Sequence, residues 1–384
     1  MSQFIDFTLP STVPGRTLHG FRCVPEGQVR AVLQLSHGMV EYIDRYRPLA
    51  EYLADRGILV TGHDHLGHGA SIRTKEDYGY FAEPDGNRAV LADLHAMTVR
   101  TKELYPGVPY FLLGHSMGSF YARQYLCEYG HELDGAIIMG TGFQPKALVQ
   151  FAKTLCRVLA AFHGWQYRSK FVANMSFMGY NKGLEGRTTH DWLNRDQAEV
   201  DKYLAEERCT FTFTLNAYYS MFSGILRLHD PAFLARMPKD LPLLFLSGDA
   251  DPVGEQGKGV RRAIQSLKDA GVLNIESIFY PGARHELLLE TNKLDWTRAH
   301  RPEFAALTAF YRGMLAIRRT CARIAGAYDE PQPFVLALQG WLIGFIPESP
   351  DPKDVVVVYY NPERTHQWVS LPIGSWRKLT DGVH

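Results

Sequence analysis

Six short apolar runs constrain the fold of this chain more than any other feature of its sequence. Their sequences are AVLQLSHG (31–38), ILVTGHD (58–64), PYFLLGHS (109–116), DGAIIMG (134–140), LPLLFLSG (241–248) and NIESIFY (274–280). Such runs are typical of strands buried on both faces of a parallel sheet. Between them lie helix-like stretches such as residues 46–57, which have proline near the first turn and glycine at the end, and residues 87–107. The alternation predicts an α/β fold with a mostly parallel, doubly wound sheet.

The alternation stops over residues 143–229, where the sequence becomes helical, aromatic and rich in methionine. We interpret this segment as a helical cap inserted into a core made of residues 1–142 and 230–300. The large apolar residues of the segment are Phe151, Phe162, Trp165, Phe171, Met175, Phe177, Met178, Phe211, Phe213, Tyr218, Tyr219, Met221 and Phe222. They either pack a small core of the cap itself or line an apolar pocket beneath it.

The sequence changes character once more near its end. Residues 297–320 have the pattern of one helix, and residues 355–379 that of strands separated by Asn-Pro and Pro-Ile-Gly turns. We therefore expect residues 301–384 to form a helix and a small β appendage.

Composition excludes several classes of partner. Lysine and arginine together number 41, as do aspartate and glutamate, so no net charge draws the protein to nucleic acid. The five cysteines are scattered without a CxxC pair, which predicts a reduced, cytoplasmic protein.

The sequence shows no targeting or membrane segment. The first fifteen residues do not form a signal peptide, and no run approaches the roughly 18 apolar residues of a membrane span. The chain is expected to be soluble, at most with peripheral contact with lipid surfaces, while its oligomeric state is not predicted.

One motif carries chemistry. Gly114-His115-Ser116-Met117-Gly118 follows an apolar run and opens a helix-like stretch. In such a strand-to-helix turn, small neighbours allow the strained backbone that lifts a serine hydroxyl above the sheet. Ser116 is the candidate nucleophile, with Gly114 and Gly118 shaping its elbow, and the Met117 N–H is directed toward the reacting carbonyl oxygen.

A serine nucleophile requires a base and an acid that orients the base. His285 follows the last apolar run and is the best-placed histidine. Asp251 follows the preceding run and is the first choice for the acid, with Asp249 in reserve. The order Ser, Asp, His along the chain is the one used by α/β hydrolases.

A second oxyanion donor is expected from the tight turn after the first apolar run, where the Met39 N–H is suitably placed. The segment HDHLGH (63–68) contains three histidines and an aspartate, which allows a metal-binding alternative. It does not match the hydrolytic motif HxHxDH, and a turn packed beside the site explains it equally well. We therefore predict no metal and no cofactor.

These motifs together resemble the monoacylglycerol lipase and lysophospholipase branch of the α/β-hydrolase fold. Four segments carry the resemblance, at residues 36–71, 114–119, 247–254 and 282–290. It implies Ser116, Asp251 and His285 as a triad and Met39 and Met117 as oxyanion donors. It also implies a polar network near the site that involves Glu41, Arg45 and His115; an exposed i,i+4 ion pair is the alternative for Glu41 and Arg45.

The chain departs from that family after residue 292. Residues 292–319 resemble the end of the barrel in bacterial pullulanases, and residues 340–382 resemble the β domain that follows it. No barrel precedes them, so the carboxylates of a glycan-cleaving site are absent from the tail. This resemblance implies a fusion.

The leading hypothesis is a serine carboxylic-ester hydrolase that cleaves small lipid esters, either monoacylglycerol or lysophospholipid, through an acyl-enzyme. Two alternatives remain. One is a serine aminopeptidase-like hydrolase, which would need an acidic group to hold a free amino terminus. The other is a weakly catalytic scaffold that acts through a carbohydrate-associated β module.

Overall fold

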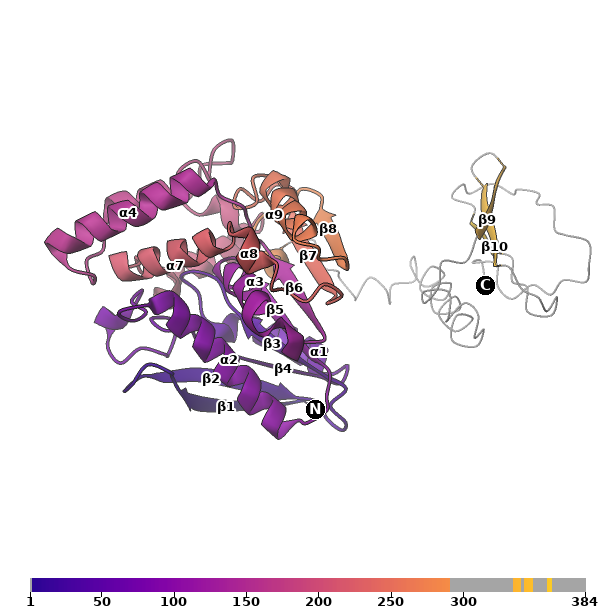
Figure 1. Ribbon diagram of the computed structural model, residues 1–384, viewed down its shortest axis with the longest axis horizontal. Helices are drawn as coiled ribbons and strands as arrows, with labels where there is room; N and C mark the ends of the chain where they lie inside the picture. Colours follow the sequence, from indigo (N-terminus) through magenta and orange to yellow (C-terminus); the bar gives the residue numbers. More distant parts are fainter. Residues whose placement is uncertain (1, 291–333, 340–341, 348–357, 361–384) are drawn as a thin grey trace, which may run out of the picture. The chain divides into compact units, whose positions relative to one another are not determined.

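A computed structural model describes residues 2–290, 334–339, 342–347 and 358–360 of the chain (Figure 1). The chain divides into two compact units, Met1–Lys293 and Leu294–His384.

The first unit is built on one eight-stranded sheet in the order β1-β2-β4-β3-β5-β6-β7-β8. The strands are β1 (Gln3–Pro10), β2 (Thr17–Val24), β3 (Ala31–Ser36), β4 (Ile58–His63), β5 (Tyr110–His115), β6 (Gly135–Met139), β7 (Leu243–Gly248) and β8 (Ile275–Tyr280). Strands β3 to β8 pair in parallel and coincide with the six apolar runs. The prediction of a mostly parallel sheet is confirmed. The antiparallel pair β1–β2, which joins β4 at one edge, was not predicted.

Helices cover both faces of this sheet. Consecutive residues of β3 show this clearly, because Val32 belongs to one core cluster and Leu33 to the other, as expected for alternating side chains in a strand. The cluster of Leu33 includes α1 (Arg47–Ala54), whereas that of Val32 includes α2 (Gly86–Leu104), α3 (Met117–Tyr129) and α9 (Lys258–Asp269). Together with the crossover order, this is the α/β-hydrolase fold.

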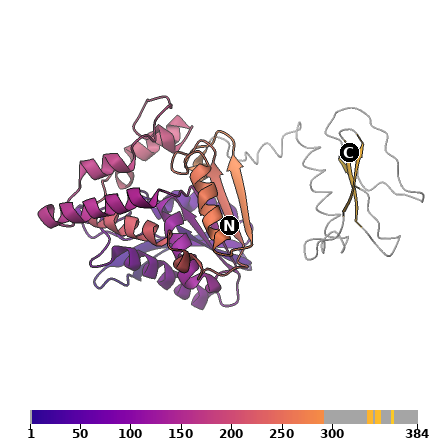
Figure 2. The ribbon, with the colours of Figure 1, turned by 45° about the horizontal axis from the view of Figure 1, so that its top comes forward.

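The cap lies between β6 and β7. It comprises α4 (Lys146–His163), α5 (Lys170–Ser176), α6 (Gln197–Ala205), α7 (Leu215–Arg227) and the short α8 (Pro231–Leu234). Helix α7 contacts α2 and α3 on one side and α4 on the other. Figures 1 and 2 accordingly show α4 at the outside of the molecule and α7 between it and the core.

In the second unit, the described residues form a three-stranded antiparallel sheet of order β11-β10-β9. Its strands are β9 (Phe334–Gln339), β10 (Leu342–Pro347) and β11 (Val358–Tyr360). The helix expected over residues 297–320 and most of the strands expected over residues 355–379 lie outside the described residues.

No helix within the described ranges is both long and apolar enough to cross a bilayer.

Candidate active site

Ser116 lies in the turn that joins β5 to α3, and its backbone takes a conformation that few side chains tolerate. Its φ is 52° and its ψ is −118°, in the half of backbone space that non-glycine residues rarely adopt. A Cβ atom at Gly118 would meet the Ser36 carbonyl oxygen at 1.9 Å, and one at Gly114 would meet the Gly118 carbonyl oxygen at 2.4 Å. Only glycine fits at these two positions. The strand, strained turn and helix have the geometry of a nucleophile elbow.

Asp251 and His285 meet in the loops that follow β7 and β8. The His285 Nδ1 donates to Asp251 Oδ2 at 2.9 Å, and both side chains are buried. The other carboxylate oxygen of Asp251 accepts from the Val253 N–H at 2.9 Å. Asp249, the reserve candidate, is exposed and instead accepts from the Gly282 N–H at 2.6 Å. The geometry therefore favours Asp251 as the partner of His285 and leaves the His285 Nε2 available for a proton.

Ser116 and His285 line one cavity at the carboxyl edge of the sheet. Within the described residues, no hydrogen bond joins the Ser116 hydroxyl to His285. Serine–histidine contacts in unliganded hydrolases are often long and shorten when substrate binds.

The loop of residues 37–41, after β3, lies against Ser116. A Cβ atom at Gly38 would stand 3.1 Å from the Ser116 Cβ. His37 Nδ1 donates to the Gly38 carbonyl oxygen at 2.8 Å; because this peptide is trans, the Met39 N–H points the opposite way. The Met117 N–H is in the first turn of α3, where helix donors have no partner within the helix. In the described part of the chain neither N–H meets a protein acceptor, so both are available to an oxygen bound beside Ser116.

Glu41 is the centre of the polar network. Its carboxylate accepts from Tyr46 Oη and His115 Nδ1, each at 3.0 Å, from Arg45 at 3.0 Å and from the Gly38 N–H. Burial tends to raise the pKa of Glu41, but the hydrogen bond and charge of His115 and the charge of Arg45 outweigh it and lower that pKa. Glu41 is thus an anion that ties the 37–41 loop to β5. The i,i+4 pair with Arg45 is present but buried, so the exposed alternative is wrong.

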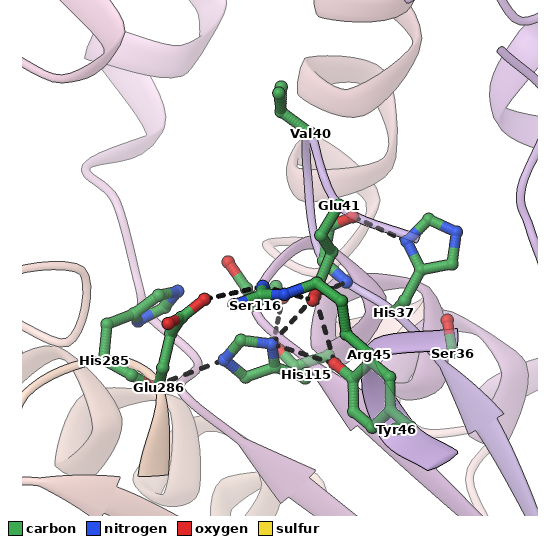
Figure 3. Close-up of polar contacts among 12 residues, drawn as sticks. Ser36, His37, Val40, Glu41, Arg45, Tyr46, His115, Ser116, His285 and Glu286 are labelled. Atoms are coloured by element: carbon green, nitrogen blue, oxygen red, sulfur yellow. Dashed lines mark hydrogen bonds and ion pairs between the residues drawn. The ribbon is translucent and has the colours of Figure 1, made fainter. Parts of the chain in front are cut away.

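His115 links this network to the histidine loop. Its Nδ1 faces Glu41, and its Nε2 donates to the His285 carbonyl oxygen at 3.3 Å (Figure 3). Both ring nitrogens face acceptors, an arrangement that a protonated imidazole satisfies. Burial tends to lower the pKa of His115, but the hydrogen bond and charge of Glu41 prevail and raise it.

Three residues near the site were not predicted from the sequence. Glu286 forms an ion pair with Arg45 at 2.7 Å, and its second carboxylate oxygen is buried with no partner among the described residues. The ring centroid of Trp192, from the cap, lies 5.2 Å from that of His285. Tyr203, also from the cap, donates its hydroxyl to the Val40 carbonyl oxygen at 2.9 Å. Only Glu286 had a local signal, because it directly follows His285 in the sequence.

The histidine-rich turn of residues 63–68 packs behind the 37–41 loop. Asp64 accepts from the Ile43 and Ala70 N–H groups at 2.7 and 2.8 Å, and His68 Nε2 accepts from the Val40 N–H at 3.3 Å. Burial is the main cause that lowers the pKa values of His63 and His68, to about 4 and about 3. Among the described residues, no cluster of histidine, cysteine or acidic side chains has the geometry to hold a metal ion. Asp64 and His68 thus support the loop and the residues that follow it, whereas both ring nitrogens of His63 are buried without a hydrogen-bond partner among the described residues.

The cavity above Ser116 has a volume of about 470 Å³ and is bounded by the core on one side and the cap on the other. Seven of the large apolar residues expected in the cap line it: Met175, Phe177, Phe211, Phe213, Tyr218, Met221 and Phe222. Others face solvent, including Phe151, Phe162, Phe171 and Met178. Glu41, Arg45, His115 and Glu286 supply a polar wall beside His285. The arrangement can hold an apolar chain with a polar group at the serine end.

Comparison with known sequences gives a match over most of the first unit. The family described as serine aminopeptidase, S33, matches residues 27–292. Monoglyceride lipase from Mus musculus is 31% identical over 276 residues, which cover 68% of this chain and 78% of that protein. A monoglyceride lipase homolog of monkeypox virus is 28% identical over 268 residues, covering 69% of this chain and 85% of the viral protein.

Solved structures show the same fold. A thermostable carboxyl esterase from Bacillus coagulans has a TM-score of 0.70 at 24% identity, covering 81% of this chain and 98% of its own. A soluble variant of the monoglyceride lipase from Saccharomyces cerevisiae, in complex with a substrate analog, has a TM-score of 0.60 at 21% identity, covering 80% and 93%.

Proposed function

This chain belongs to the serine aminopeptidase S33 family of α/β hydrolases, and on that premise we propose that it hydrolyses monoacylglycerols and similarly small lipid esters. The observation that carries the proposal is the position of Ser116 and the His285–Asp251 pair at the polar end of an apolar cavity. The similarity to monoglyceride lipases over most of their length supports it.

In the proposed reaction, Ser116 attacks the ester carbonyl while His285 takes the hydroxyl proton. Asp251 holds the imidazole in the tautomer that leaves Nε2 free to accept. The Met39 and Met117 N–H groups stabilise the negative charge on the carbonyl oxygen. His285 then returns the proton to the departing alcohol, and an acyl-enzyme remains on Ser116. His285 then takes a proton from a water molecule as its oxygen attacks the acyl carbon. The ester bond to Ser116 breaks, His285 returns the proton to the serine oxygen, and the fatty acid leaves.

The two walls of the cavity support a division of the substrate. The seven apolar cap residues suit an acyl chain, because burial of its methylene groups stabilises binding by about 0.8 kcal/mol each. The polar wall, where the carboxylates of Glu41 and Glu286 face the cationic Arg45, suits hydroxyl groups of the alcohol part.

The test is the release of fatty acid from a series of monoacylglycerols of increasing chain length, with p-nitrophenyl esters alongside. We expect turnover that peaks at one chain length and is abolished by Ser116→Ala, which removes the nucleophile and leaves the fold intact. Thermal denaturation of the variant provides the control for folding. Full activity in the Ser116→Ala protein, or no turnover of any ester by the wild type, contradicts the proposal. A lysophospholipid series in the same assay distinguishes the two classes of head group.

One observation favours aminopeptidase activity as a second candidate. Glu286 presents a buried carboxylate oxygen without a partner in the described residues, directly after His285 in the chain. Such a group can accept from a free amino terminus. Release of p-nitroaniline from aminoacyl p-nitroanilides, lost in Ser116→Ala, is the measurement that would place this activity above ester hydrolysis.

Two further proposals concern the protein's surroundings. Exposed apolar side chains on α4, among them Phe151 and Phe162, which is 79% exposed, support peripheral contact with lipid surfaces. Four cysteines are buried and free, namely Cys23, Cys127, Cys156 and Cys209, which supports a cytoplasmic location.

The likeness of the tail to a pullulanase end, and hence a fusion, rests on sequence alone, because most of residues 292–382 lie outside the described part. Retention of the protein on soluble starch would support a carbohydrate-associated role for the tail. Equal migration in gels with and without starch would count against it.

A further inference from the structure

Val40 has an unusual backbone conformation for its residue type. Its φ is 54°, in the left-handed region, where a β-branched side chain is strained and which persists only when the surrounding structure imposes it. Val40 directly follows Met39, whose N–H is one of the two proposed oxyanion donors. The strained residue thus lies inside the loop whose geometry matters for charge stabilisation.

Two hydrogen bonds hold the peptide groups on either side of the Val40 Cα. Its N–H donates to His68 Nε2 at 3.3 Å, and its carbonyl oxygen accepts from the Tyr203 hydroxyl at 2.9 Å. His68 Nδ1 donates to the Leu66 carbonyl oxygen at 3.0 Å, so the neutral ring has its Nε2 lone pair free to accept. Both peptide groups that follow the Met39 N–H are therefore fixed by side chains from distant parts of the chain.

Tyr203 is held firmly enough to act as such a restraint. It comes from α6 of the cap and is buried, with the Arg45 guanidinium 5.1 Å from its ring centroid and the His190 ring 5.6 Å away. Its hydroxyl therefore connects the cap to the loop beside Ser116 through a single hydrogen bond.

We propose that Tyr203 is a positioning residue for the oxyanion hole: its hydroxyl keeps Val40 in the left-handed conformation and so keeps the Met39 N–H directed at the reacting oxygen. The inference rests on the proposed ester hydrolysis by Ser116. It makes the cap a part of the charge-stabilising machinery as well as a wall of the acyl pocket.

The first test is Tyr203→Phe, which removes the hydroxyl and keeps the ring against Arg45. We expect kcat for a p-nitrophenyl ester to fall about three- to tenfold, as for loss of one neutral hydrogen bond, with KM unchanged. The matched control is Tyr42→Phe, which removes another hydroxyl-mediated bond between core and cap, from Tyr42 to Glu206 at 3.2 Å, without touching the Val40 peptide. A kcat loss in the control equal to that in Tyr203→Phe would overturn the inference.

The second test uses Val40→Gly, because glycine adopts the left-handed conformation without strain. If Tyr203 acts by restraining Val40, Tyr203→Phe should lower kcat less than about twofold when introduced into the Val40→Gly protein. Undiminished loss in that background would mean that the hydroxyl acts by another route, and the inference fails.

The rate at which a fluorophosphonate labels Ser116 provides a readout that does not depend on ester turnover, because its phosphoryl oxygen occupies the same donors. Tyr203→Phe should slow labelling by the same factor as it lowers kcat. If the wild type cleaves no ester, the proposed function fails, while the labelling rates of the wild type, Tyr203→Phe, Val40→Gly and the double variant still test the role of Tyr203. Equal labelling of wild type and Tyr203→Phe would refute that role.

Discussion

The two loops that meet at Ser116 are held in place by different means. The elbow depends on backbone geometry, since Gly114 and Gly118 leave no space for a side chain between β5, α3 and the end of β3. The 37–41 loop depends on side chains that arrive from elsewhere, such as His68 and, 163 residues away, Tyr203. The conformation of the elbow thus depends on five consecutive residues, whereas the conformation of the neighbouring 37–41 loop depends on residues from distant parts of the domain.

The largest effect should come from the Asp251–His285 hydrogen bond, which, like the contacts of the 37–41 loop, joins side chains that are far apart in the sequence. Asp251→Asn should lower kcat by up to about four orders of magnitude, because an amide favours the wrong tautomer of the histidine. The measurement is steady-state ester hydrolysis. Asp249→Asn is the matched control, since the Asp249 carboxylate accepts from the Gly282 N–H and Asp251 is the carboxylate that binds His285. If Asp249→Asn were the more damaging change, the acid would have to be reassigned.

The elbow can be disrupted without removing any polar group. Gly118→Ala would place a Cβ atom 1.9 Å from the Ser36 carbonyl oxygen, and we expect a loss of about 3 kcal/mol or more in the free energy of unfolding. Urea denaturation measures it. Gly107→Ala is the control, because nothing lies within 4 Å of its added Cβ atom and only its φ of 74° opposes alanine. Equal losses in the two variants would show that the elbow is less closely packed than described.

Acid should destabilise the protein through the buried histidines of residues 63–68, which pack behind the 37–41 loop. Burial lowers the pKa of His63 to about 4 and that of His68 to about 3, whereas an unfolded chain binds these protons near pH 6.5. The unfolded state therefore binds more protons between these values. The stability that these neutral histidines contribute is complete above pH 6.5 and is lost as the pH falls toward 4.

This pH dependence can be measured by urea denaturation at several pH values. His63→Leu should flatten the slope of unfolding free energy against pH by up to about 1.4 kcal/mol per pH unit between pH 4 and 6.5, since one fewer proton is taken up on unfolding. His131, with an exposed side chain, offers the control variant His131→Leu. An unchanged slope in His63→Leu would mean that the buried cluster does not account for the acid sensitivity.

The smallest effect is expected for changes on the outer helix α4, which leave both the elbow and the 37–41 loop unchanged. Phe151→Ser with Phe162→Ser removes exposed apolar area from α4 and should weaken adsorption to lipid vesicles by roughly tenfold, with hydrolysis of a soluble ester unaffected. Cosedimentation with vesicles measures the adsorption. Leu273→Ser, at an exposed residue before β8, serves as the comparison. If it weakened adsorption as much, contact through α4 would be excluded.

Much of the fold could be predicted from local sequence patterns. The six apolar runs became β3 to β8, because a strand buried on both faces needs an almost continuous apolar sequence. The β1–β2 pair was not predicted; its strands, such as QFIDFTLP, mix polar and apolar residues at the edge of the sheet. The helix expected over residues 297–320 lies outside the described residues.

The candidate site was predictable where chemistry follows strand ends. Ser116, Asp251 and His285 lie after parallel strands, whose carboxyl ends share one edge of the sheet. Trp192 and Tyr203 could not be found in this way, because their positions depend on how the cap folds back over that edge. The burial of Glu41 and Arg45 likewise follows from the contacts of the folded chain and not from their spacing.

The left-handed conformation of Val40 also has a consequence for how such sequences diverge. A relative that carries glycine at this position adopts the left-handed conformation without strain. The tyrosine hydroxyl of the cap is then not needed to hold the loop, and its loss should be tolerated. A relative that keeps a β-branched residue there is expected to keep the tyrosine, because substitutions within one hydrogen-bonded unit are not independent. Covariation between positions 40 and 203 across relatives would therefore indicate that this contact between cap and core has been maintained during evolution.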